Sequence, residues 1–388
     1  MVRFCTGLSS QTSPRPNRFL YTIIMSSKIT LFIYNLTIGG AERVTVNLAN
    51  QLTECGYQVE VLVVTEDGDL IDELVPEVEL SSLSVNEMRW SAIPLARHLR
   101  RTRPDVLISF MTAANVMAIV AARMARISTT VIATEHSTKS KVRDITQKPD
   151  LILAKYLYRY ADHVVGVSKG VSNDIREWAR VPDDKVVTIY NPVISEEAIA
   201  TTYEPPSHQW FHDDSIDVVL SVGRHIRQKD YPTLIRSFAL LLEERENVRL
   251  MLLGGGELTS EYESLIAELD IEDEVAMPGF VTQPYPYMAH ADVFALSSRV
   301  EGLSLVLIEA MACGTTVVST NCPNGPSEVL VDGKYGELVP VGDPDSLKSA
   351  LTRALLHPTD EGLLRERAGD FSIKKAATEY EQLFSTTQ

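Results

Sequence analysis

The sequence is poor in cysteine, in long apolar segments and, over its second half, in basic residues, and each shortage excludes a class of protein. The four cysteines lack the spacing of a zinc site or a disulfide framework, so we expect reduced thiols in a cytoplasmic protein: Cys5, Cys55, Cys313 and Cys322. No apolar run reaches the roughly 20 residues of a membrane-spanning helix. Within residues 1–27, FLYTIIM is too short and too late for a secretory signal, so we expect a disordered extension or a mis-assigned start.

Charge is unevenly distributed along the chain. The formal net charge is −16, and we expect no nucleic-acid partner. Residues 201–388 hold 14 basic against 30 acidic residues, whereas Arg89 to Arg159 holds 13 basic and 4 acidic residues. Trp90 and Tyr156 accompany these basic residues. We interpret the basic stretch as a docking face for an anionic membrane, and the alternative is a set of ordinary solvated helix faces.

Apolar strands alternate with amphipathic helices from Lys28 onward, and this pattern predicts two parallel α/β domains. The chain of 388 residues is long enough for two cores. We place the first domain at residues 28–200 and the second at residues 215–372. A polar, proline-containing segment at residues 201–214 is predicted to be the linker between them.

Two carboxylates, Glu301 and Glu309, lie eight residues apart in the stretch EGLSLVLIEAMACGTTVVST. The spacing predicts a turn after a strand, then a helix from about Leu303 to Ala312 that ends at Gly314. In a parallel sheet, the free N–H groups at the start of such a helix face the crevice where anions bind. Glu309 could face the same crevice and accept the hydroxyls of a sugar, and the alternative is a solvated helix face.

Other residue types suited to an anionic ligand follow other predicted strands. Gly39 and Gly40 at a helix start allow a phosphate to approach the backbone, although such a turn can be a plain connection. Arg224 and Lys229 could neutralise a diphosphate, or could belong to a solvated basic loop. His136 ends a strand and would face the crevice, although most single histidines are structural.

Two ligand classes are disfavoured. The glycine run in VRLMLLGGGE is not a dinucleotide fingerprint, because Thr259 stands where the last glycine is required. An NAD-dependent enzyme is therefore a weak interpretation. Asp67-Gly68-Asp69 and Asp343-Pro344-Asp345 resemble metal-binding Asp-x-Asp motifs, but aspartate, glycine and proline in this order favour turns. We expect no metal.

Four stretches together resemble the retaining glycosyltransferases of family 4: the E-x7-E stretch from Glu301, IGGAERV, TEHS and VGRHIRQKD. The resemblance runs from about Lys28 to the C-terminus. It implies the GT-B arrangement, in which two Rossmann-like domains face each other across a deep cleft. It also implies that a C-terminal helix within residues 373–388 crosses back to the first domain.

The resemblance implies a role for each candidate residue. His136 and Glu301 would contact the donor sugar as catalytic residues. The donor diphosphate would be bound by Gly39, Gly40, Arg224, Lys229, Gly302, Leu303 and Ser304. The ribose and base would be bound by Glu309, Gly255, Phe280 and Val281.

The implied activity is retaining transfer of a hexose or N-acetylhexosamine from a nucleotide sugar, a UDP-sugar by preference, without a cofactor. Residues 321–343 resemble family members that extend lipid-linked or surface glycans, so we expect a glycan or lipid-diphosphate acceptor. The expected location is the cytoplasmic face of the membrane. Two alternatives stay open, namely a sugar-nucleotide epimerase of the same fold and a non-catalytic nucleotide-sugar-binding protein.

Overall fold

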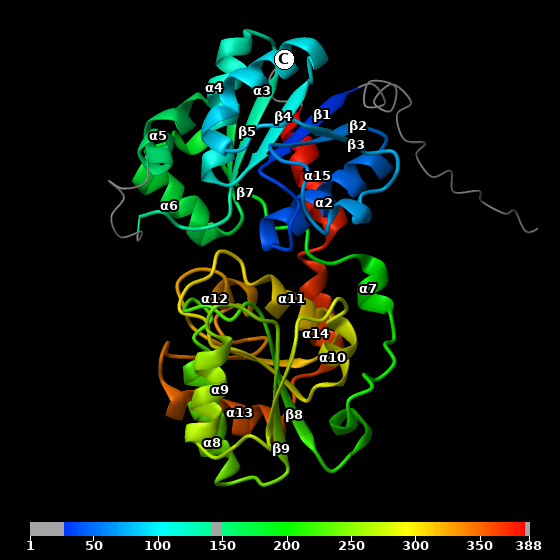
Figure 1. Ribbon diagram of the computed structural model, residues 1–388, viewed down its shortest axis with the longest axis vertical. Helices are drawn as coiled ribbons and strands as arrows, with labels where there is room; N and C mark the ends of the chain where they lie inside the picture. Colours follow the sequence, from blue (N-terminus) through cyan, green and yellow to red (C-terminus); the bar gives the residue numbers. More distant parts are fainter. Residues whose placement is uncertain (1–26, 141–148, 385–388) are drawn as a thin grey trace, which may run out of the picture.

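The computed structural model describes residues 27–140 and 149–384 and divides them into two stacked domains (Figure 1). The first contains a seven-stranded sheet in the order β3-β2-β1-β4-β5-β6-β7. The second contains a six-stranded sheet in the order β10-β9-β8-β11-β12-β13. Every strand pairing in both sheets is parallel, which confirms the predicted α/β fold with two Rossmann-like domains.

The central strands of the first domain are short apolar runs buried on both faces, as expected for a parallel sheet covered by helices, whereas the edge strand at Glu79–Ser82 is polar and partly exposed. The strands are β1 (Lys28–Ile33), β2 (Gln58–Val63), β3 (Glu79–Ser82), β4 (Val106–Phe110), β5 (Thr130–Glu135), β6 (His163–Gly166) and β7 (Val186–Thr188). The helices are α2 (Gly40–Glu54), α3 (Ala92–Thr102), α4 (Thr112–Ala125), α5 (Pro149–Leu157) and α6 (Lys169–Ala179). Short 3-10 turns η2 (Met88–Trp90) and η4 (Tyr158–Tyr160) precede α3 and follow α5.

The second domain repeats the alternation after a connection that contains α7 (Glu196–Ala200) and η6 (Gln209–His212). Its strands are β8 (Asp217–Val222), β9 (Val248–Leu253), β10 (Val275–Gly279), β11 (Val293–Leu296), β12 (Thr316–Thr320) and β13 (Glu337–Val339). Its helices are α8 (Tyr231–Leu242), α9 (Thr259–Glu268), α10 (Tyr285–His290), α11 (Leu305–Ala312), α12 (Pro326–Val329), α13 (Pro344–Leu356) and α14 (Glu361–Gly369).

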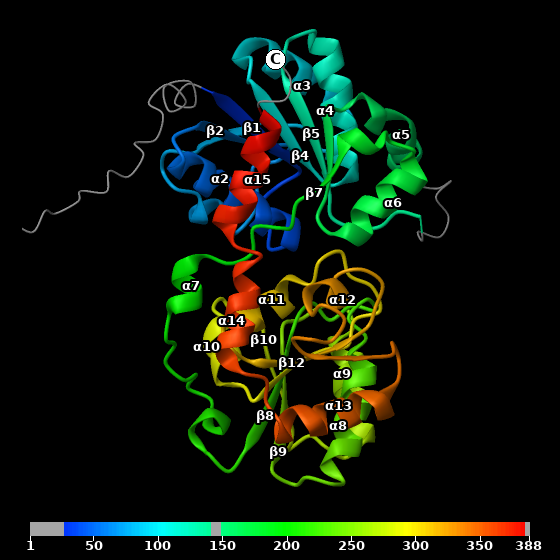
Figure 2. The ribbon, with the colours of Figure 1, turned by 180° about the vertical axis from the view of Figure 1, so that it is seen from behind.

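The last helix, α15 (Ile373–Phe384), leaves the second domain and packs against the first. Figures 1 and 2 draw it beside α2. Its buried face includes Tyr380 and Leu383, and the Tyr380 hydroxyl lies 3.1 Å from Thr134 Oγ1 at the end of β5. The chain therefore crosses between the domains a second time, and α15 anchors the second domain to the core of the first.

The carboxyl ends of the two sheets face each other. His136 follows β5 of the first domain, and Gly302 follows β11 of the second. A side chain added at Gly302 would collide with the carbonyl oxygen of His136, so the two backbones are in direct contact. Ligands of open parallel sheets bind at such strand ends. The fold therefore gathers the candidate residues at one boundary.

Two further sequence features can be placed. In the part of the chain that the structure describes, no helix combines the length and apolarity needed to cross a bilayer. The two Asp-x-Asp segments lie in a turn and at a helix start: Gly68 has a φ of +133°, and Asp343 caps α13 by accepting a hydrogen bond from Ser346 N at 3.1 Å. Residues 1–26, which include Cys5, lie outside the described residues.

We predict that α15 contributes strongly to stability through Tyr380. Tyr380→Ala should lower the free energy of unfolding by about 3 to 5 kcal/mol, the usual cost of truncating a buried aromatic ring. Tyr380→Phe keeps the ring and loses only the contact with Thr134, so it should cost about 1 kcal/mol. Urea unfolding followed by circular dichroism measures both. Equal and small losses would contradict the packing described for α15.

Candidate active site

Helix α11 begins at Leu305, later than the predicted start at Leu303, because Ser304 forms its N-cap. Leu303 is buried in the core, so its side chain holds the loop while its backbone faces the boundary. The Ser304 hydroxyl is buried and has no hydrogen-bond partner among the described residues. Free N–H groups at a helix start and an unpaired hydroxyl are suited to bind an anion.

Glu301 and Lys229 pair directly with each other. Lys229 Nζ donates to Glu301 Oε1 at 2.7 Å, and the two side chains are only 16% and 9% exposed. Ser298 Oγ donates to the same carboxylate oxygen at 2.6 Å. Sequence reasoning assigned the two residues to different parts of a ligand, whereas the structure shows them as one ion pair. Because an ammonium group has three N–H donors, a ligand can bind Lys229 beside Glu301 or in exchange for it.

Glu309 projects from α11 and is half-buried. Burial raises the pKa of Glu309 to about 7, and the charges of Arg43 and Lys229 partly oppose this rise. Arg43 lies on α2 of the first domain and also pairs with Glu73. Its influence on Glu309 was not predicted, although it lies within the IGGAERV stretch. The carboxylate of Glu309 is thus poised to ionise near neutral pH.

The start of α2 meets α11 across the domain boundary. A side chain at Gly40 would come within 3.2 Å of Leu305 Cδ1, so a larger residue here would require the leucine to shift. Gly39 is extended, with a φ of −169°. Arg224 is exposed, and its charge lowers the pKa of Glu42 on α2, although burial raises that pKa overall. Arg224 therefore faces the first domain, as a residue that bridges a bound diphosphate would.

The glycine turn after β9 lies at the same sheet edge. Gly254 has a φ of +126°, and a side chain there would collide with the carbonyl oxygen of Gly223. Gly255 accepts a hydrogen bond from His225 N at 2.9 Å, and a side chain at Gly255 would meet no neighbour. Phe280 is 60% exposed, whereas Val281 packs against the core. Phe280 is thus free to stack on a base.

His136 lies at the end of β5, with its ring centroid 6.0 Å from that of Phe110. The residue as a whole is half-buried, but its Nε2 atom is buried and has no hydrogen-bond partner among the described residues. Burial, aided by the charge of Lys139, lowers the pKa of His136 to about 3. The imidazole is therefore neutral at physiological pH and can exchange hydrogen bonds with a hydroxyl group.

A contact that sequence reasoning missed joins the domains at α6. Lys169 N, in the first turn of this helix, donates to both carboxylate oxygens of Glu328 at 2.8 and 3.0 Å. The Tyr190 hydroxyl donates to Glu328 Oε1 at 2.6 Å. Glu328 belongs to α12 of the second domain, so a carboxylate of one domain neutralises a helix N-terminus of the other.

The structure brings most of the predicted site residues to this boundary. His136, Gly40 and Arg224 face the opposite domain, and Glu301 and Lys229 lie behind them as a pair. Within the described residues, 27–140 and 149–384, no group of three or more histidine, cysteine, aspartate or glutamate side chains is arranged to bind a metal ion. The arrangement offers cations, a free helix N-terminus and a neutral imidazole to a ligand that carries both phosphate and hydroxyl groups.

Comparison with solved structures identifies the fold, and family models match both domains. The chain superposes on the Anabaena protein Alr3699/HepE, crystallised in complex with UDP, with a TM-score of 0.78 at 20% identity, over 93% of this chain and 100% of that one. The fold is therefore GT-B. The family model for "Glycosyltransferase Family 4" matches residues 38–197, and the model for "Glycosyl transferases group 1" matches residues 206–374.

Curated relatives agree over nearly the whole chain. An N-acetylgalactosamine-N,N'-diacetylbacillosaminyl-diphospho-undecaprenol 4-alpha-N-acetylgalactosaminyltransferase of Campylobacter jejuni is 30% identical over 368 residues, which cover 90% of this chain and 97% of the relative. The lipopolysaccharide core biosynthesis glycosyltransferase LpsE of Rhizobium meliloti is 26% identical over 92% of this chain and 99% of its own length. The chain belongs to the GT-B glycosyltransferases of group 1 and family 4.

We predict that Glu309→Gln weakens UDP binding and stabilises the fold. A carboxyl group with a raised pKa contributes stability that is complete below its ordinary value of 4.5 and is lost as pH rises through about 7. The variant should therefore be more stable than wild type at pH 8 and equal to it near pH 5. Wild-type UDP affinity should fall by up to about tenfold per pH unit below 7, because binding uses the carboxylate.

Thermal unfolding and isothermal titration calorimetry at pH 5, 6, 7 and 8 measure the two effects. The UDP affinity of Glu309→Gln should be low and independent of pH. If wild type and variant bound UDP equally at pH 8, Glu309 would not be a ligand of the nucleotide.

Proposed function

We propose that the chain is a retaining glycosyltransferase that transfers a hexose or N-acetylhexosamine from a UDP-sugar to a lipid-diphosphate-linked glycan. The observation that carries this proposal is the facing of His136 and the Glu301–Lys229 pair across the domain boundary beside a free helix N-terminus. The names of two Campylobacter jejuni relatives support the acceptor class, since both describe transfer to undecaprenol-linked diphosphate glycans. The UDP complex of HepE supports the nucleotide.

The proposed roles follow from the charges at the boundary. Arg224, Lys229, Gly40 and the start of α11 bind the diphosphate. Glu309 accepts the ribose hydroxyls, and Glu301 and His136 contact the donor sugar. These cations and N–H dipoles are fixed before the reaction, so they stabilise negative charge as it develops on the departing phosphate oxygen.

The chemical step can be written without a residue that forms a covalent intermediate. The bond between the anomeric carbon and the UDP oxygen breaks, and the acceptor hydroxyl oxygen bonds to that carbon on the same face. Its proton passes to the departing phosphate oxygen. The neutral imidazole of His136 accepts a hydrogen bond from a sugar hydroxyl or donates one to it. No step requires a metal ion or a cofactor.

We predict that UDP release from a UDP-sugar requires a lipid-diphosphate acceptor and persists in EDTA. The test is a screen of UDP- and GDP-sugars with and without bacterial lipid extract. A sugar-nucleotide epimerase would convert the donor without any acceptor, and a binding protein would release nothing. Lys229→Ala should lower the rate of turnover at subsaturating donor, because losing a charged partner of the bound donor costs about 2 to 5 kcal/mol of binding free energy. Loss of activity in EDTA that Mn²⁺ restores would contradict the metal-free assignment.

The proposed location is the cytoplasmic membrane surface, with contact through one helical layer. We define the basic face as the exposed side chains of η2, α3, α4, α5 and η4, together with Arg103 and Arg126, the C-cap residues of α3 and α4. It carries seven exposed large apolar side chains: Trp90, Ile93, Met124, Ile152, Leu153, Tyr156 and Tyr160. Exposed arginines accompany them: Arg89, Arg97, Arg100, Arg101, Arg103, Arg123, Arg126 and Arg159. Aromatic and basic side chains together are suited to the headgroup region of an anionic bilayer.

Not every arginine of the basic face is free to bind lipid. Arg100 donates to the carbonyl oxygens of Met124 and Ala125 at the end of α4, so it has a structural role. Arg123 lies over the ring of Tyr160, 4.4 Å from its centroid. Residues 141–148 of the basic stretch lie outside the described residues.

We predict that Arg97, Arg126 and Arg159 together account for much of the binding to anionic vesicles. Each arginine near such a surface contributes roughly 1 kcal/mol, so changing all three to glutamine should weaken binding by about two orders of magnitude. The test is sedimentation with anionic and neutral liposomes across a salt series. Arg236→Gln on α8 of the second domain is the matched control and should bind like wild type. Equal binding to both lipids would favour a soluble acceptor.

A further inference from the structure

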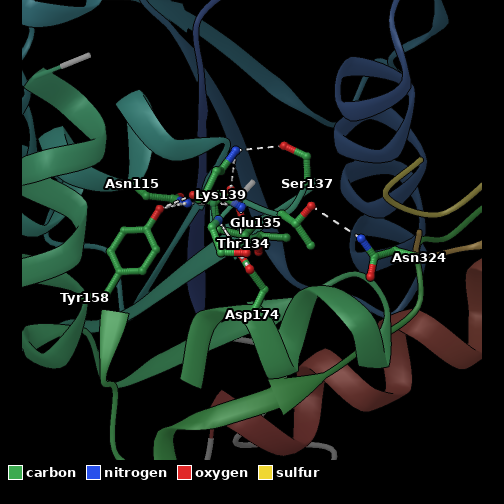
Figure 3. Close-up of polar contacts among 10 residues, drawn as sticks. Asn115, Thr134, Glu135, Ser137, Lys139, Tyr158, Asp174 and Asn324 are labelled. Atoms are coloured by element: carbon green, nitrogen blue, oxygen red, sulfur yellow. Dashed lines mark hydrogen bonds and ion pairs between the residues drawn. The ribbon is translucent and has the colours of Figure 1, made fainter. Parts of the chain in front are cut away.

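The loop that carries His136 is held by a buried polar network in the first domain (Figure 3). Glu135, the last residue of β5, is 1% exposed. The Tyr158 hydroxyl donates to Glu135 Oε1, and Asn115 Nδ2 donates to that hydroxyl at 3.2 Å. Asn115 also donates to the carbonyl oxygen of Thr134 at 2.9 Å, so one amide orients both the strand end and the tyrosine.

Lys139 closes this network from the other side of His136. Its Nζ atom lies 3.1 Å from Glu135 Oε2 and donates to Ser137 Oγ at 2.8 Å. The lysine side chain is only 13% exposed. Its backbone N–H donates to Asp174 Oδ2 of α6 at 2.6 Å. The residues on both sides of His136 are therefore joined to each other and tied to a helix.

Nothing in the donor site described above uses Glu135 or Lys139. A buried ion pair is weak evidence for stability, because desolvation of the two charges offsets most of their attraction. Stability alone therefore does not explain the Glu135–Lys139 pair. A better explanation is the effect of the pair on the residue that lies between its two members. His136 is the residue enclosed, since Glu135 precedes it, Ser137 follows it, and the Lys139 side chain contacts both.

We propose that the Glu135–Lys139 ion pair is a positioning device that closes the loop around His136 and fixes the orientation of this residue at the domain boundary. Glu135 and Lys139 are positioning residues, because they bond to each other and to the neighbours of His136 rather than to the reacting atoms. The inference rests on the proposed function, in which His136 contacts the donor sugar. Asn324 of the second domain, whose Nδ2 lies 3.4 Å from Thr138 Oγ1, reaches the same loop.

The two partners act on His136 with opposite signs. Besides Glu135 and Lys139 on its own segment, the charged and titratable groups around the His136 loop include Tyr158 from η4, Asp174 from α6 and the Glu301–Lys229 pair beyond Gly302. Lys139 disfavours the imidazolium form. Removing this cation raises the pKa of His136, whereas removing the Glu135 charge leaves the cation uncompensated and keeps the pKa low.

The test is a double-mutant analysis of transfer kinetics with wild type, Glu135→Gln, Lys139→Met, His136→Ala and the two double variants that contain His136→Ala. Each single change at Glu135 or Lys139 should lower kcat by about a hundredfold with little change in KM, the usual effect of a displaced catalytic group. In the His136→Ala background, neither change should lower kcat further. Lys139→Arg should restore most of the activity, because it keeps the charge.

A pH series separates positioning from general loosening of the fold. In wild type and Glu135→Gln, kcat at saturating donor should not change between pH 8 and 5, while in Lys139→Met the pKa of His136 should be higher than in wild type. Imidazole NMR signals of His136 report the same shift without turnover. Glu60→Gln is the matched control, because Glu60 is also a buried carboxylate, paired 2.9 Å from His98 Nε2, in the same domain. It should lower stability but leave kcat and its pH profile unchanged.

The outcomes distinguish this inference from the proposed function. If wild type releases UDP from no sugar nucleotide with any acceptor, the proposed function fails, and the NMR titration still tests the charge effect. If wild type transfers sugar but the Glu135 and Lys139 effects add fully to that of His136→Ala, the positioning role is wrong. The same holds if both variants shift the pKa of His136 in one direction.

Discussion

The backbone contact between His136 and Gly302 is the constraint on which the rest of the site depends. A side chain at Gly302 would collide with the His136 carbonyl oxygen. The two sheets can therefore approach this closely only because residue 302 is a glycine, which has no Cβ atom. The approach brings α2 and α11 together at Gly40 and Leu305, and it removes water from the charges around them. In a medium of low dielectric these charges act more strongly on one another and on a bound ligand.

The unusual ionisation of the site follows from this loss of solvent. Burial raises the pKa of Glu309 and lowers that of His136, so each group is shifted toward its neutral form. At pH values above the raised pKa, the buried charge of Glu309 lowers the stability of the fold, and a loss of stability of this kind is common in active sites. The second crossing of the chain, through α15, holds the domains together while the boundary between them remains polar.

Much of the fold could be predicted because its signals are local. The alternation of apolar strands and amphipathic helices predicted both parallel sheets, and the helix expected within residues 373–388 is observed at Ile373–Phe384. The start of α11 was predicted too early because Leu303 fits the apolar pattern, while the Ser304 cap and the buried loop decide the boundary. The GT-B fold and the transferase class came from motif resemblance rather than from periodicity.

The pairings within the site could not be predicted from the sequence. Lys229 and Glu301 are 72 residues apart, and each alone has the residue type of a ligand contact. Arg43 and Glu328 act across the domain boundary, so no local pattern marks them. Arg100 belongs to the basic stretch Arg89 to Arg159, and its position there did not reveal its hydrogen bonds to the end of α4. Spacing reveals which residues share an element, but not which partner each one finds.

The Glu301–Lys229 pair also implies an order of events when a donor binds. Without a ligand, Lys229 and Glu301 neutralise each other at a mostly buried position, so neither charge is left unpaired at the boundary. A diphosphate offers Lys229 a stronger partner, because it carries more negative charge than one carboxylate. Lys229 and Ser298 both donate to Glu301 Oε1, so a turn of Lys229 toward the diphosphate would free acceptor capacity on that atom while Ser298 still holds the carboxylate in place. The nucleotide would thereby enlarge what Glu301 offers to a sugar hydroxyl.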